Sequence, residues 1–237
     1  ARLIRDGSAD VILAGGSEAA VTPIAIAAFA RMGALSGRHD APELASRPFD
    51  VARDGFVIGE GAAFLVLERW DRAIARGARI YGEIAGYGRN ADAYHVTAPS
   101  PGGVGAAECM RLALADAGLE PSDIGHVNAH GTSTQLNDAA EAEAVVKVFG
   151  ESMLPVTSIK GVTGHLIGAA GAAEAVASFL AMRDGTVPPT ANHISTEDEL
   201  TIDMVHGAPR ALAAAPVVSN SFGFGGHNAT LVLVPRT

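Results

Sequence analysis

Short apolar strands alternate with helices through most of this chain, and several strands run directly into glycine-rich turns. The order is clearest in the second half, where strand 124–129 precedes helix 139–149 and strand 156–159 precedes helix 166–182. Strands that alternate with helices pair mainly in parallel, so the pattern predicts an α/β architecture. Turns at the ends of such strands are where α/β folds place their chemistry.

Two of these glycine-rich turns contain histidine. The first reads NAHGTST and holds His130, and the second reads SIKGVTGH and holds Lys160 and His165. Two imidazoles and an ammonium presented in this way can stabilise a developing negative charge by hydrogen bonding. Either histidine alone could equally be a core residue satisfied by the backbone. The prediction of a catalytic site therefore depends on the pair.

Lys160 follows an apolar strand, where an unpaired ammonium would be costly to bury. It therefore needs an anion nearby. Glu174 is the candidate, because it interrupts a helix of small residues and because glutamate is almost never fully buried without a partner. The alternative is that both side chains face solvent.

The net charge of −9 comes from acidic residues scattered along the chain, which argues against nucleic acid as a partner. No apolar run reaches the ~18 residues of a membrane span. The single cysteine, Cys109, excludes an internal disulfide and fits a reducing compartment. It lies in an amphipathic helical pattern, so we expect a buried core thiol rather than a nucleophile. These features predict a cytoplasmic protein.

Two parts of the sequence resemble each other, each with a helix ending in Arg-Asp-Gly, a strand, a glycine-rich turn and a second strand. They comprise residues 3–7, 11–14, 56–61 and 63–67 in the first part, and 181–185, 217–219, 222–226 and 231–234 in the second. This order predicts a duplicated fold, in which residues 1–76 end the N-terminal half and 77–237 form the C-terminal half. Chance similarity between short apolar strings is the alternative. By symmetry, we expect the nucleophile that these residues lack to lie before Ala1.

Several motifs occur together and in order: RPFD at 47–50, DGF at 54–56, GEG at 59–61, the two histidine turns, and NSFGFGG at 220–226. In this combination the chain resembles the β-ketoacyl-acyl-carrier-protein synthases of the thiolase-like superfamily, most closely the elongating type. The resemblance implies a thiolase-like duplicated fold, layered α-β-α-β-α, with mixed five-stranded sheets. It also implies a decarboxylative Claisen condensation, in which malonyl-carrier protein loses CO₂ and the enolate attacks an acyl group on a cysteine upstream of Ala1.

The resemblance also implies roles for individual residues. His130 and His165 would donate hydrogen bonds to the malonyl thioester oxygen as neutral imidazoles, and Lys160 and Glu174 would orient them. The N–H of Phe224 would form part of the acyl oxyanion hole, and its ring would gate the acyl pocket. The substrate-binding residues would be Thr97, Thr132 and Thr134 for pantetheine, with Phe29 and Phe222 beside the acyl chain. Serine and threonine in turns are more often local backbone caps, and the Phe224 turn could be a plain hairpin.

A structural cation occurs in some relatives at positions that match Asn128, Glu174, Ser219 and Asn220, and oxygen ligands of this kind suit Na⁺, K⁺ or Mg²⁺. No other cofactor is implied. The expected partners are acyl carrier protein and a second copy in a homodimer. His227 stands where many relatives have threonine, which bears on substrate preference.

Three other functions fit parts of this pattern. A polyketide ketosynthase would use the same chemistry with a different carrier protein. A non-catalytic chain-length-determining subunit would have lost the nucleophile, although retention of the two histidines, Lys160 and Glu174 argues against it. A plain thiolase would have a second cysteine near the C-terminal glycine-rich turn, where this chain has Phe224.

Overall fold

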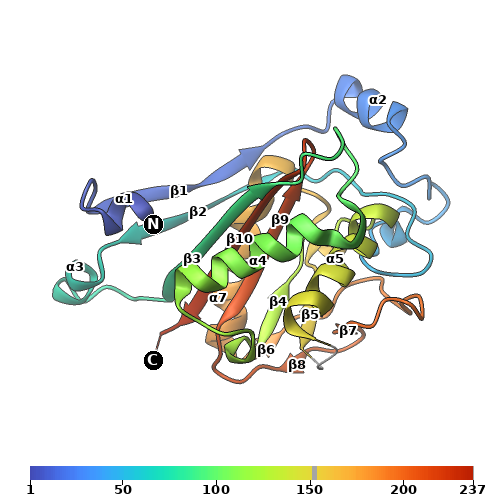
Figure 1. Ribbon diagram of the computed structural model, residues 1–237. Coiled ribbons are helices and arrows are strands. Elements are labelled where there is room, and N and C mark those ends of the chain that lie inside the picture. The colour runs from blue at the N-terminus through green and yellow to red at the C-terminus, as the bar shows by residue number, and fades with distance from the viewer. Residues whose placement is uncertain (151–153, 237) are drawn as a thin grey trace.

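A six-stranded mixed sheet forms the centre of the computed structural model, which describes residues 1–150 and 154–236 (Figure 1). In spatial order its strands are β3 (Gly82–Ala91), β10 (His227–Pro235), β9 (Val217–Gly223), β4 (His126–Asn128), β5 (Pro155–Thr157) and β7 (Asp203–Met204). β10 pairs antiparallel with both β3 and β9, whereas β9, β4, β5 and β7 pair in parallel with one another. The parallel part is where the alternating pattern predicted it.

Helices cover both faces of this sheet. Helices α4 (Val104–Ala117) and α5 (Gln135–Phe149) lie on one face, and α7 (Ala170–Asp184) lies on the other. Neighbouring strand residues divide between the two cores: Val218 packs with α4 and α5, whereas Val217 packs with α7. This is the alternation that strands buried on both sides require.

A separate two-stranded ribbon packs against the outer side of α7. It consists of β1 (Val11–Glu18) and β2 (Gly61–Glu68), which pair antiparallel along their whole length. The layers are therefore α4 and α5, the sheet, α7 and the ribbon, which give four of the five predicted layers. The predicted strand counts differ: the sheet has six strands because the two-residue β7 joins its edge, and the ribbon has two.

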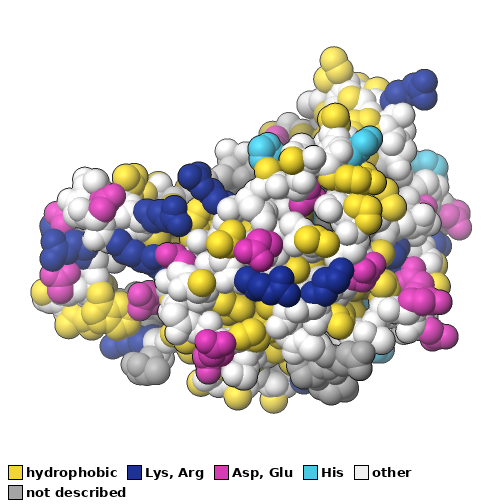
Figure 2. Space-filling view, viewed as in Figure 1, with side chains coloured by type: hydrophobic (Ala, Val, Ile, Leu, Met, Phe, Trp, Pro, Cys, Tyr) yellow, Lys and Arg dark blue, Asp and Glu magenta, His cyan; other side chains and the backbone are white. Residues whose placement is uncertain are grey.

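Shorter elements complete the described chain. They are α1 (Arg2–Arg5), α2 (Pro23–Arg31), η1 (Pro42–Leu44), α3 (Trp70–Ala75), η2 (Pro101–Gly103), η3 (Pro121–Asp123), α6 (Lys160–Thr163), η4 (Ile167–Ala169), β6 (Thr186–Val187) and β8 (Arg210–Ala211). The helices α1 and α3 lie at the outer end of the ribbon, where Figure 2 shows hydrophobic side chains at the surface. None of the helices in the described residues is long and apolar enough to cross a membrane.

The apolar sequence of residues 11–14 predicts a buried first strand, and this prediction is wrong, because β1 is not buried in the structure. Residues of β1 are alternately exposed and half-buried, and Leu13 and Val66 of the ribbon are each 66% exposed. Their sequence is that of a strand covered on both faces, but α7 covers only one face of the ribbon here. The strand pairs β1–β2 and β9–β10 are both antiparallel, as a duplicated unit requires. The boundary between residues 76 and 77 stays a prediction.

Candidate active site

The turn that holds His130 is fastened by two carboxylates from α5. The backbone N–H groups of His130 and Gly131 donate to the two oxygens of Glu141, each at 2.8 Å. Asp138 accepts from the N–H groups of Thr132 and Ser133 at 3.0 and 3.1 Å. Burial raises the pKa of Glu141 to about 7. Because the backbone N–H groups from His130 to Ser133 all donate to these two carboxylates, the turn has little conformational freedom.

Sequence reasoning missed Glu141 and Asp138, although a signal was present. Both are acidic residues in a helix made largely of alanine and valine, and they lie three positions apart on the same face. The same argument that selected Glu174 would have selected them, because buried carboxylates require partners.

Lys160 and Glu174 form the buried ion pair that the sequence predicted. Both side chains are 2% exposed, and Lys160 Nζ is bonded to Glu174 Oε1. The ammonium also donates to the carbonyl oxygen of His130 at 2.5 Å and lies 3.3 Å from Nδ1 of its ring. Lys160 is the first residue of the short helix α6 rather than part of a strand end. The contact with His130 is thus made from the first residue of α6.

His165 is held by backbone groups at three points. Its N–H donates to the Val57 oxygen at 2.7 Å, its carbonyl oxygen accepts from Gly59 N–H at 3.0 Å, and its ring Nδ1 accepts from Ile167 N–H at 3.1 Å. Ile167 has φ of +45°, a left-handed conformation that is rare for a β-branched residue. The turn after His165 is thus strained, and in this conformation the N–H of Ile167 points toward the imidazole ring.

The two histidine rings lie together, with centroids 5.2 Å apart and planes at 82°. Burial and the Lys160 charge lower the pKa of His165 to about 3, and burial, Lys160 and His165 hold the pKa of His130 well below its ordinary value. Both rings are therefore neutral near pH 7. Because Nδ1 of each ring faces a donor, the ring proton belongs on Nε2. Each imidazole thus has one N–H available for a ligand.

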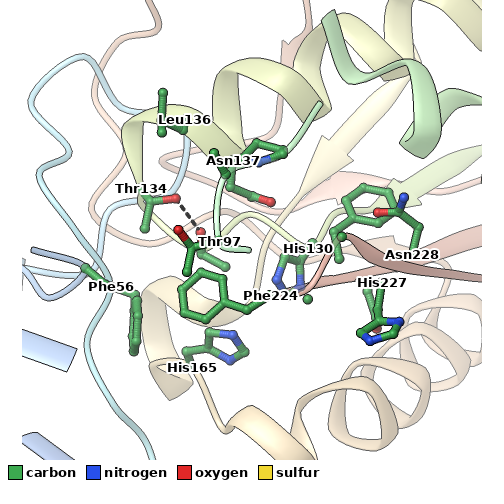
Figure 3. Close-up of a pocket in the computed structure, with 18 of the residues that line it drawn as sticks. Phe56, Thr97, His130, Thr134, Leu136, Asn137, His165, Phe224, His227 and Asn228 are labelled. Carbon is green, nitrogen blue, oxygen red and sulfur yellow. Dashed lines mark hydrogen bonds between the residues drawn. The ribbon is translucent and has the colours of Figure 1, made fainter. Parts of the chain in front are cut away.

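Both rings line a cavity of about 1080 Å³, shown in Figure 3. All of the predicted substrate-binding residues line it as well: Phe29, Thr97, Thr132, Thr134 and Phe222, together with Phe224. Lys160 and Glu174 are not among its lining residues; they support the ring of His130 from outside it. The structure therefore brings the predicted residues to one place, while their roles stay predictions.

Phe56 is a residue at the cavity that was not predicted to have a role there. Phe56 lies edge-on to His165 with ring centroids 5.4 Å apart, and Phe29 lies edge-on to Phe56 at the same distance. His130 continues this series of rings to Phe222 at 6.1 Å. The series packs against the histidine pair, which agrees with burial as the main cause of the lowered pKa values.

The turn between β9 and β10 is tied to the loop that follows β3. Gly225 N–H donates to the Val96 oxygen at 2.7 Å, and Asp92 N–H donates to the Gly226 oxygen at 2.9 Å. Phe224, which is 48% exposed, and Thr97 are consequently carried by two loops that are bonded to each other.

Two sequence comparisons identify the family to which the chain belongs. Residues 1–73 match the N-terminal domain of beta-ketoacyl synthase, and residues 81–193 match its C-terminal domain. The chain belongs to the β-ketoacyl synthase family. It is 50% identical over 232 residues to a 3-oxoacyl-[acyl-carrier-protein] synthase 2 of Synechocystis sp., covering 97% of this chain and 56% of that protein. The synthase of the same name from Coxiella burnetii is 50% identical over 235 residues, covering 98% and 57%.

Solved synthase structures share the fold. A β-ketoacyl synthase from Burkholderia phymatum matches with a TM-score of 0.96 and 43% identity, over 100% of this chain and 57% of that one. The type II polyketide complex AntDE:AntF, an acyl-carrier protein with its ketosynthase, matches with a TM-score of 0.97 and 38% identity, over 100% and 59%. The thiolase-like α/β class predicted from the sequence is confirmed. The chain spans a little over half the length of the curated synthases that it matches.

The residues that match a cation site in some synthases differ in how far their side chains are engaged by hydrogen bonds. Asn220 donates to Glu141 and accepts from Thr230, so both ends of its amide are engaged. Asn128 donates to the Ser219 hydroxyl at 3.3 Å. Glu174 Oε2 is buried and has no hydrogen-bond partner among the described residues. The cation site stays a prediction. Within the described ranges, no three acidic, histidine or cysteine side chains form a metal cluster.

Cys109 lies where a core thiol was predicted. It is fully buried on α4, it does not line the cavity, and burial raises the pKa of its thiol. A buried thiol with a raised pKa is a poor nucleophile.

Proposed function

We propose that this chain supplies the decarboxylation site of an elongating 3-oxoacyl-acyl-carrier-protein synthase of fatty acid synthesis. The observation that supports this most strongly is the pair of neutral imidazoles at one cavity, each with Nδ1 engaged and Nε2–H available. Such a pair can hold an oxygen that gains charge without first transferring a proton to it.

The decarboxylation uses these two donors directly. The malonyl thioester oxygen accepts from Nε2–H of His130 and of His165, the bond between the malonyl methylene carbon and its carboxylate breaks, and CO₂ leaves. The electron pair of that bond forms the enolate, whose charge collects on the held oxygen. One preorganised donor of this kind is worth about 3 kcal/mol, or about 100-fold in rate.

The condensation then forms a carbon–carbon bond. The enolate carbon attacks the carbonyl carbon of an acyl-cysteine thioester, and the cysteine thiolate leaves. The backbone N–H of Phe224 and that of the cysteine stabilise the tetrahedral oxyanion in between. We place that cysteine in a part of the synthase outside this sequence, because the buried Cys109 cannot serve.

Lys160 contributes charge and position. Its ammonium lowers the pKa of both histidines and, through its contact with Nδ1, sets the tautomer of His130. Glu174 balances the charge of that buried ammonium. We also propose that the free Oε2 of Glu174 can anchor a hard cation such as Na⁺, K⁺ or Mg²⁺. Anomalous scattering from crystals grown with rubidium tests this, and the absence of a peak beside Glu174 would contradict it.

The proposed partner is acyl carrier protein. The Thr132 and Thr134 hydroxyls, 2.9 Å apart at the cavity, suit the amides of a phosphopantetheine arm. The similarity to AntDE:AntF, whose structure contains an acyl-carrier protein bound to its ketosynthase, supports the same kind of docking. A homodimer in the cytoplasm, without nucleic acid, stays a prediction.

A polyketide ketosynthase remains the second candidate, because AntDE:AntF is so close in structure. The greater identity to the fatty acid synthases, 50% against 38%, favours fatty acid elongation. Intact-protein mass spectrometry of the full-length synthase with acyl carrier proteins tests both. We expect acylation on a cysteine from a saturated acyl carrier protein, followed by release of a 3-oxoacyl product. Acylation from a polyketide carrier protein alone would favour the second candidate, and no acylation would favour a chain-length-determining subunit.

A further inference from the structure

The segment just before β2 runs beside the turn that holds His165. Ile58 and His165 form a parallel β-bridge, in which His165 N–H donates to Val57 at 2.7 Å and Gly59 N–H donates to His165 at 3.0 Å. A short piece of the N-terminal part thus holds the backbone of His165 on both sides. The mechanism proposed above makes no use of this segment.

Gly59 permits the close approach. A Cβ at Gly59 would overlap the backbone oxygen of Thr163 and lie 2.9 Å from Cδ2 of Leu166. Thr163 and Leu166 are the residues on either side of the His165 turn, and a backbone oxygen cannot rotate away as a side chain can. Any side chain at position 59 must therefore displace the turn.

Gly61 provides a matched comparison. It lies two residues further along the chain, at the start of β2, and a Cβ there would meet Cδ2 of Leu166 at 3.6 Å, which is ordinary van der Waals contact. Neither glycine has a positive φ. Neither position therefore imposes left-handed backbone strain on an alanine, and the two substitutions differ in what the methyl group meets.

Displacement of the turn would act on the imidazole. The ring is oriented through Nδ1 by the amide of Ile167, whose left-handed φ of +45° persists only while the surrounding structure holds it. Loss of that hydrogen bond would release both the orientation and the tautomer of the ring.

We propose that Val57–Gly59 is a positioning segment for His165, and that glycine at position 59 is required for it to hold the ring in register for decarboxylation. This inference rests on the proposed function, because it gives a role to the geometry of His165.

The test compares Gly59→Ala with Gly61→Ala in the full-length synthase. The measurements are CO₂ release from malonyl-carrier protein per acylated cysteine, KM for malonyl-carrier protein, and the extent of cysteine acylation. A misplacement of about 1 Å can cost about 100-fold in rate. We expect Gly59→Ala to lower kcat for CO₂ release by ~10- to 100-fold, with KM and acylation close to wild type, and Gly61→Ala to leave all three unchanged.

Normal CO₂ release by folded Gly59→Ala would overturn the inference, as would an equal loss of acylation and CO₂ release, which indicates a general structural role. If Gly59→Ala does not fold, Gly59→Ala/Leu166→Ala removes the side-chain part of the overlap and is compared with Leu166→Ala. Equal CO₂ release by the double variant and by Leu166→Ala would also overturn the inference. A wild-type synthase that releases no CO₂ would instead contradict the proposed function itself.

Discussion

Nζ of Lys160 donates a hydrogen bond to Glu174 and lies 3.3 Å from Nδ1 of His130. One ammonium therefore forms a buried ion pair and also contacts the imidazole. The arrangement links stability to chemistry, because the ammonium that fixes the tautomer of His130 is buried and its charge is balanced by Glu174.

Replacement of Lys160 by methionine should therefore destabilise the protein strongly. The substitution leaves the carboxylate of Glu174 buried without a counter-charge, which costs about 3–5 kcal/mol in the free energy of unfolding. Urea unfolding of the full-length synthase measures it. Lys147→Met is the control, because Lys147 is 41% exposed and pairs with Glu143 at the surface, where the expected loss is at most about 1 kcal/mol. Similar losses for the two variants would contradict the account of the ion pair.

His126 should make the protein sensitive to acid. It is buried on β4, both ring nitrogens are without a hydrogen-bond partner in the described structure, and burial lowers its pKa to about 3. Below pH ~6.5 this histidine binds a proton in the unfolded chain but not in the folded chain. As the pH is lowered, this residue therefore decreases the free energy of unfolding by about 1.4 kcal/mol per pH unit. His126→Phe should reduce the difference in unfolding free energy between pH 7.5 and pH 5. The exposed His39→Phe is the control; an identical pH dependence in both variants would refute the prediction.

Glu141→Gln should disturb the turn of His130. An amide in place of the carboxylate presents an NH₂ group to one of two backbone N–H donors, so a buried hydrogen bond is lost at a cost of about 1–3 kcal/mol. We expect lower stability and slower CO₂ release, with cysteine acylation retained. Glu143→Gln, on the exposed face of the same helix, should change neither quantity. Unchanged CO₂ release in Glu141→Gln would show that the turn does not depend on this carboxylate.

The sequence predicted the elements that have strong patterns. The parallel strands, α7 and the Lys160–Glu174 pair all follow from periodicity and from the cost of burying a charge, which are local properties. The two-residue strands β6 and β8 and the helix α6 were missed because they are too short to show a period. The exposure of Leu13 was not predictable, because it depends on what covers the ribbon rather than on the strand itself.

Much of the site depends on contacts between distant segments, and these the sequence does not display. The left-handed conformation of Ile167 contradicts its local preference and exists because the surrounding turn imposes it. The bridge from Val57 and Gly59 to His165 likewise joins residues far apart in the chain. The motif GEG marked the position, but only the structure shows what the first glycine touches.

The central claim is that two neutral imidazoles share the charge of the enolate. Its most direct test is CO₂ release from malonyl-carrier protein by His130→Ala and His165→Ala forms of the full-length synthase, with exposed His39→Ala as control. The account predicts a loss of about 100-fold or more in each of the first two, with cysteine acylation largely intact and the control unchanged. Undiminished CO₂ release from either variant would contradict it.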